Sequence, residues 1–132
     1  MHFAPDTEDG LEFAVALSNT VAGATKSRED ELLTIAQLAV LLAESGYSGR
    51  IDHDEKELAE VRATRDRIRH VWTLDRDAAA GEVDVMLQDA RALPRLSRHD
   101  GFDWHLHATD LAAPLAERIR VEFSLALVDV IR

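Results

Sequence analysis

Cysteine is absent from this 132-residue chain, and proline, glycine and aromatic residues are scarce. Without cysteine the chain has no disulfide, no thiol nucleophile and no cysteine-ligated zinc site. It also lacks an uncharged apolar run of about 18 residues, so we expect no membrane span. The N-terminus lacks the basic start and apolar stretch of a signal peptide. These absences predict a cytoplasmic protein.

Positive charge is also in deficit, because 15 Lys and Arg against 25 Asp and Glu give a net charge of −10. A surface this negative repels the phosphate backbone of nucleic acids, so we expect no DNA binding by this chain alone. The sequence contains no glycine-rich phosphate loop, nucleophile elbow or helical His-Glu-x-x-His motif. We therefore expect a protein that is not an enzyme and that needs no cofactor.

Helical patterning is what the sequence has in abundance, and its 46% hydrophobic residues suffice for the core of one domain. After a loose entry over residues 1–10, the pattern predicts helices over residues 11–17, 34–46, 54–72, 82–92 and 111–132. We expect residues 75–81 to fray or bend. From residue 93 to 109 the period changes to two, and Asp100-Gly101 predicts a hairpin that pairs 95–99 with 102–107. The predicted fold is mainly α, about five helices with one β-hairpin before the long C-terminal helix, in a single domain over residues 1–132.

Arg65 departs from the ordinary pattern of an amphipathic helix. It stands inside an apolar stripe that runs from Leu58 to Trp72 in steps of three and four. A buried guanidinium needs an anionic or multi-acceptor partner. That partner is either a core-facing carboxylate or helix-end carbonyls, which would make Arg65 structural, or a bound anion, with Arg62 or Arg69 assisting from adjacent turns. A third alternative is that Arg65 snorkels along the helix surface.

Asn19 is the second candidate, because an Asn after an apolar segment either braces a loop or points into the same cavity as Arg65. The candidate ligand-binding residues are therefore Asn19, Arg62, Arg65, Arg69 and Trp72. Alternatively, Trp72 has a structural role in the core, at the contact between helix and hairpin, and Trp104 fits the same role.

His105 and His107 share one face of the predicted strand, a spacing that can chelate a metal. No third ligand is placed near them, however, and we expect this face, opposite Trp104 and Leu106, to lie in solvent. The sequence therefore predicts no metal site.

The order of the segments resembles the ABATE domain, a family of stress-induced transcription regulators, over almost the whole chain. The matching stretches are Phe13-Ala14-Val15-Ala16-Leu17-Ser18-Asn19-Thr20-Val21, Leu33-Thr34 with Leu38-Ala39, Leu41-Leu42 and Gly46, then Leu58, Arg62, Arg65 and Ile68, and finally Asp110-Leu111 with Pro114-Leu115-Ala116.

The resemblance implies the regulatory half of a bacterial transcription factor, because in that family the domain precedes a CGNR-type zinc finger that binds DNA. Here the chain ends at Arg132, about where the finger would begin. We expect a sensor that binds a small anionic ligand and signals through the C-terminal helix to the missing finger. The alternative is a stand-alone interaction or dimerisation module without a ligand. It is favoured by the last helix, which is apolar nearly all around at Leu125, Leu127, Val128 and Ile131.

Overall fold

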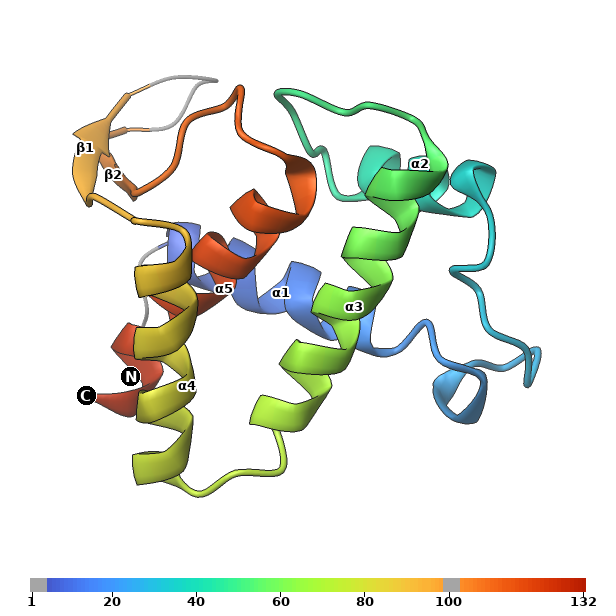
Figure 1. Cartoon of the computed structure of the whole chain (residues 1–132), viewed down its shortest axis with the longest axis horizontal. Coiled ribbons are helices and arrows are strands. Elements are labelled where there is room, and N and C mark those ends of the chain that lie inside the picture. Colours follow the sequence, from blue (N-terminus) through green and yellow to red (C-terminus); the bar gives the residue numbers. More distant parts are fainter. Residues whose placement is uncertain (1–4, 99–102) are drawn as a thin grey trace.

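The computed structural model describes residues 5–98 and 103–132. This part of the chain forms five α-helices, a short 3-10 turn and one antiparallel pair of strands (Figure 1). The elements are α1 (Pro5–Ser18), η1 (Ala22–Ala24), α2 (Ile35–Glu44), α3 (Glu55–Val71), α4 (Arg76–Asp89), β1 (Arg95–Ser97), β2 (His105–His107) and α5 (Leu115–Ile131). The predicted class, mainly α with a hairpin before the last helix, is confirmed.

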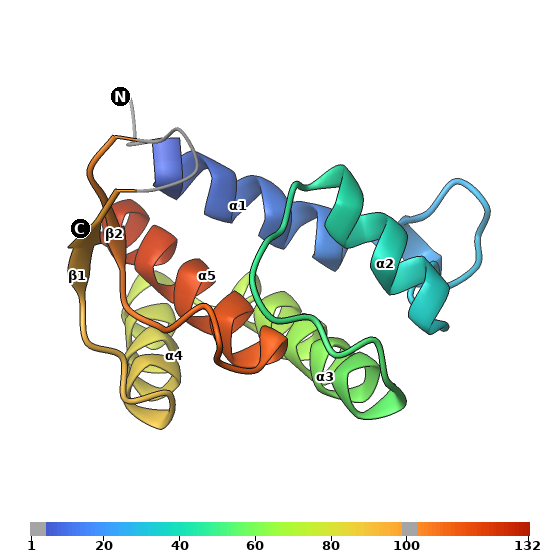
Figure 2. The same cartoon turned by 90° about the horizontal axis from the view of Figure 1, so that it is seen from above.

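Helix α5 is the centre of the fold. Seen from above, it lies between α1 on one side and α3 and α4 on the other (Figure 2), and it contacts all three. Leu115, Ile119 and Phe123 follow one another at steps of four on its buried side, which gives α5 a continuous apolar stripe. Burial of this stripe against three helices builds the main hydrophobic core.

Side-chain caps set the starts of three helices. Thr34 and Gln37 form the predicted capping box at α2. Asp54 accepts a hydrogen bond from the amide of Glu57 at the start of α3, and Asp75 accepts one from the amide of Ala78 at the start of α4. The cap at Asp75 explains why α4 begins at Arg76, so the prediction that residues 75–81 fray and that the helix starts at residue 82 is wrong.

The ends of the chain also differ from the prediction. The loose entry over residues 1–10 is wrong from Pro5 onward, because α1 already begins there, with Pro5 in its first turn. Gly10, which lowers helix propensity, instead allows close packing, since a Cβ there would lie 3.3 Å from that of Ala126 in α5. Helix α5 begins at Leu115 rather than Leu111, because Pro114 has an extended backbone and serves as its N-cap residue.

The hairpin forms, with shorter strands than predicted. Leu96 pairs with Leu106 at its centre, and the predicted Asp100-Gly101 turn lies outside the described residues. The predicted orientation is wrong, because Leu96, Trp104 and Leu106 are exposed while His105 and His107 are half-buried. Period-two alternation defines two faces of a strand but does not say which one meets the body. Here the helices close the main core without any described hairpin residue.

In the described part of the chain, no helix combines the length and the apolar character that crossing a membrane requires.

Candidate functional site

Four of the five predicted site residues lie together on one side of α3. Each of them donates a hydrogen bond to residues 18–32, which comprise Ser18 at the end of α1 and most of the connection to α2; the four are Arg62, Arg65, Arg69 and Trp72. We call these four side chains the α3 clamp. The partners of these four side chains decide what the α3 clamp does.

Arg65 is the buried member of the α3 clamp, with 4% of its surface exposed. Its two terminal nitrogens each donate to one carboxylate oxygen of Asp30 at 2.9 Å, and Nη1 also donates to the Thr20 hydroxyl at 2.9 Å. This bidentate geometry lowers the pKa of Asp30 from its usual 3.8 to about 2, mainly through the hydrogen bond from Arg65, while burial opposes the shift. The acceptor is therefore the protein itself, as the structural interpretation of Arg65 required.

The other members of the α3 clamp hold the backbone and side chains of the same segment. Arg62 donates to the carbonyl of Leu32. Arg69 donates to the carbonyl of Ser18 at 2.6 Å, and the Trp72 indole donates to the Ser18 hydroxyl at 3.1 Å. Trp72 is 43% exposed and meets Phe123 edge-on, so it lies at the rim of the core and not inside it.

Asn19 does not join this arrangement, because it is exposed and its neighbour Thr20 occupies the place next to Arg65. The Thr20 hydroxyl also donates to the carbonyl of Leu17 at 2.7 Å, which caps the C-terminal end of α1. The chain thus supplies at least one acceptor to each member of the α3 clamp, and these contacts fix the connection between α1 and α2. Nε of Arg65 is buried and has no hydrogen-bond partner among the described residues.

A second buried arginine, Arg118 in α5, escaped the sequence analysis. It is 1% exposed and donates to the carbonyls of Ala113 at 3.1 Å, Ser48 at 2.7 Å and Arg50. The guanidinium carbon also lies 5.6 Å from the centre of the Tyr47 ring. The signal was present, since Arg118 sits three residues after Leu115 and one before Ile119, inside the stripe of the last helix. The criterion applied to Arg65 would have found it.

Tyr47 and Glu122 complete this second cluster. The Tyr47 hydroxyl donates to Oε2 of Glu122 at 2.5 Å. Burial raises the pKa of Glu122 above its usual 4.5, and the hydrogen bond from Tyr47 and the charge of Arg118 oppose the rise. Burial and the charge of Glu122 raise the pKa of the Tyr47 hydroxyl well above 10. The cluster joins the connection between α2 and α3 to α5.

Two hollows flank the start of α5. The smaller, of about 50 Å³, is lined by Arg50, Asp52, Lys56, Glu57, Glu60, Pro114 and Leu115. The larger, of about 280 Å³, is lined by Ala90, Arg91, Leu93, Arg95, Ala108, Thr109, Asp110, Ala113 and Glu117. We call the larger hollow the α4–α5 cleft. None of the five predicted site residues lines either hollow.

Comparison with known proteins places this geometry in a family. Residues 11–120 match the model of the ABATE family, whose description is "putative stress-induced transcription regulator". The chain belongs to the ABATE family. No curated protein matches the chain. The matched region of this ABATE domain contains the α3 clamp, Arg118 and the whole α4–α5 cleft.

Over residues 5–98 and 103–132 of this ABATE domain, no three His, Asp or Glu side chains are grouped so that they could hold a metal ion. His105 and His107 lie on the half-buried face of β2, with ring centres 4.7 Å apart. The face that carries them therefore differs from the solvent face expected from the sequence.

Proposed function

We propose that this ABATE domain is the non-enzymatic regulatory part of a bacterial transcription regulator. In this proposal it senses a small charged ligand and passes the signal along α5 to a DNA-binding zinc finger that the 132 residues do not include. The description of the family supports a role in transcription. The observation that carries the signalling route is the placement of α5, which contacts α1, α3 and α4 and ends at Ile131.

Both ends of α5 are connected to features that could take part in a signal. Near its start, Glu117 lines the α4–α5 cleft. In its last turn, Asp129 accepts a hydrogen bond from the Thr7 hydroxyl of α1 at 2.7 Å, and the carbonyl of Ile131 accepts one from Nε of Arg76 in α4 at 2.7 Å. A helix of 17 residues spans about 25 Å. A displacement of the start of α5 at the cleft would therefore be transmitted along this one helix to its last turn.

The charge of the chain supports a division of labour between sensing and DNA contact. A net charge of −10 opposes the counterion release on which DNA affinity rests. We expect residues 1–132 to cause no mobility shift of duplex DNA at about 150 mM salt. A sequence-specific shift under these conditions would contradict this part of the proposal.

The regulatory role can be tested in the organism that encodes the chain. Deletion of the gene should change the transcripts induced by heat, oxidant or osmotic stress, and the wild-type gene should restore them. Arg76→Ala, which removes the bond to Ile131, should restore them poorly although an exposed substitution changes stability by only about 0.5 kcal/mol. Arg28→Ala, in an exposed loop, is the control that should behave like the wild type. A deletion that leaves all these responses unchanged would refute the proposal.

The alternative, a homodimer through the C-terminal helix, now rests on fewer residues than the sequence indicated. Leu127 is buried, Leu125 is half-buried and Ile131 packs against the core. The exposed apolar side chains of the last turns are Val128 and Val130. Sedimentation equilibrium tests this candidate. A dimer that dissociates in the Val128→Lys and Val130→Lys double variant would favour it.

A further inference from the structure

We infer that the α4–α5 cleft binds a small zwitterion of about amino-acid size. Its anionic group would meet Arg91 and Arg95, and its cationic group would meet Asp110 and Glu117. This inference deepens the proposed sensing role, because it gives the ligand a chemical class and a site.

The charges in the cleft point to a ligand of both signs. Two arginines and two acids line the hollow, and the remaining walls are mainly small and apolar, with Ala90, Leu93, Ala108 and Ala113 among them. A simple anion would gain from the arginines but would be repelled by the carboxylates, and a simple cation would meet the reverse. A zwitterion satisfies both pairs. The hollow of about 280 Å³ has room for a small ligand and is open to solvent, since Leu93 on its wall is 78% exposed.

Two arginines of the cleft are exceptions within this protein. Of the thirteen arginines, ten use their side chains in a hydrogen bond or ion pair with residues 5–98 and 103–132, and the three that make none with these residues are Arg28, Arg91 and Arg95. Arg28 lies in an exposed loop. Arg91 and Arg95 line the same hollow. Apart from Arg28, the arginines outside this cleft bond to the described chain, whereas the two arginines of the cleft do not.

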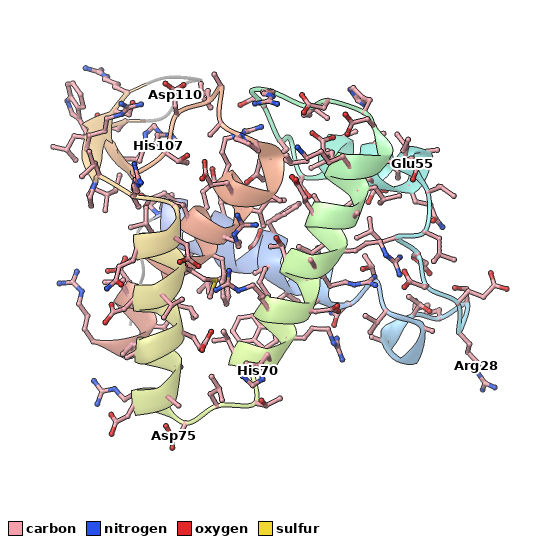
Figure 3. The ribbon with its side chains drawn as sticks, in the orientation of Figure 1. Arg28, Glu55, His70, Asp75, His107 and Asp110 are labelled. Carbon is pink, nitrogen blue, oxygen red and sulfur yellow. The ribbon has the colours of Figure 1, made fainter. Side chains whose placement is uncertain are left out.

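The acids of the cleft are likewise available. Oδ1 of Asp110 accepts a hydrogen bond from the amide of Ala112 at 2.9 Å, which orients the carboxylate and leaves its second oxygen open. Glu117 makes no hydrogen bond or ion pair with residues 5–98 or 103–132, and the nearest charge known to act on it is that of Arg120 in the same helix. Figure 3 shows Asp110 between the hairpin and the start of α5, on the side of the molecule away from the loop that carries Arg28.

The backbone of Arg91 gives an independent indication. Its φ is +49°, in the left-handed region that favours glycine. The amide of Arg91 donates to Gln88 and that of Ala92 to Leu87, which is the Schellman arrangement that commonly has glycine at this position. The chain thus has a strained arginine where glycine would suit the fold better, and its side chain lies on the cleft wall. Arg28 and His53 also have a positive φ, so the backbone of Arg91 supports the site only together with the place of its side chain on the cleft wall.

The direct test is a titration of the ¹⁵N-labelled chain followed by NMR. The probes are the proteinogenic amino acids, glycine betaine, taurine and aminoethylphosphonate. At least one should shift the amide signals of the cleft residues with a Kd below about 1 mM. Acetate carries only the negative charge and methylammonium only the positive one. Each should bind at least about tenfold more weakly than that zwitterion. If no probe shifts these signals, or if acetate binds as well as the best zwitterion, the inference is wrong.

Arg91→Gly separates binding from folding. The variant should bind the best zwitterion at least about tenfold more weakly. Its Tm should stay equal or rise by roughly 2–4 °C, because the backbone strain at residue 91 is relieved. Arg28→Gly is the matched control, since Arg28 also has a positive φ of +62° and points away from the body at the other end of the molecule (Figure 3). It should show the same direction in Tm and an unchanged Kd.

The outcomes distinguish this inference from the regulatory proposal. An Arg91→Gly variant that keeps full affinity, or whose Tm falls by more than roughly 5 °C, would show that Arg91 serves the fold and would overturn the site. The stress-dependent transcription could still respond to the deletion, so the regulatory role would stand. Binding without any transcriptional effect would instead refute that role and leave the cleft as a ligand site.

Discussion

Arg65→Met removes the charge of the buried clamp residue while it keeps much of its length and apolar bulk. The variant leaves the Asp30 carboxylate without its bidentate partner and the Thr20 hydroxyl without its donor. Breaking a buried ion pair from one side usually costs about 3–5 kcal/mol. Asp30 keeps the amide of Leu32, at 2.8 Å, and the more distant Arg62, at 3.4 Å. We therefore expect a loss near 3 kcal/mol, at the lower end of this range.

The pKa of Asp30 gives a second route to the same magnitude. It falls from 3.8 to about 2 on folding. At about 1.4 kcal/mol per pH unit, this difference corresponds to about 2.5 kcal/mol, which is an order of magnitude for a side chain that is 19% exposed. Because the folded-state pKa is depressed, this stabilisation is present above pH 3.8 and is lost as the pH falls toward 2. The wild type should lose it in that window, and Arg65→Met should not.

Urea unfolding followed by circular dichroism at pH 7 and at acid pH measures both effects. The double variant Arg65→Met/Asp30→Asn is the internal control, since removal of both charges should cost less than the sum of the single substitutions. An Arg65→Met variant that loses less than about 1 kcal/mol at pH 7, or that shows the wild-type acid dependence, would refute the assignment of Asp30 as the partner of Arg65.

Two further substitutions test the second buried arginine. Gly49→Ala should destabilise the fold by about 2–4 kcal/mol in the same urea assay, because φ is +84° and the added Cβ would lie 2.8 Å from Nη1 of Arg118. The control is Gly46→Ala, which has a positive φ but no atom within 4 Å of the added Cβ. It should cost only about 1–2 kcal/mol. Tyr47→Phe should destabilise the fold by about 1–3 kcal/mol at pH 7 and by less at pH 5, because Glu122 loses its hydrogen-bond donor and the penalty applies to the ionised carboxylate. An equal loss at both pH values would contradict the assignment of Glu122 as the partner of Tyr47.

The helices and their order could be predicted because they depend on local signals. The Thr34 capping box, the Asp54 cap and the apolar stripe of α3 are readable within one or two turns. The errors arose where tertiary contacts override propensity. Gly10 weakens a helix taken alone, yet its close approach to Ala126 stabilises α1 in the folded chain.

The candidate site was predictable only as a list of residues. The stripe showed that Arg65 is buried, but its partner Asp30 lies 35 residues away, in a polar loop without periodicity. Sequence alone cannot bring such a pair together. The α4–α5 cleft was missed for the same reason, because its walls come from the end of α4, the hairpin and the start of α5. No window of sequence contains all three.

The choice of arginine over lysine connects these observations. The chain has thirteen arginines and two lysines. Its two long connections, over residues 19–34 and 45–54, bury few large apolar side chains, and each is held by a buried guanidinium, Arg65 for the first and Arg118 for the second. A guanidinium offers five donors in a fixed plane, so one side chain can bind several acceptors of an irregular loop, which the three donors of a lysine cannot do in the same geometry. In a protein that uses arginine in this way, Arg91 and Arg95 stand out because their side chains bond to no acceptor in the described part of the chain, and the cleft that they share is where the proposed ligand would supply acceptors.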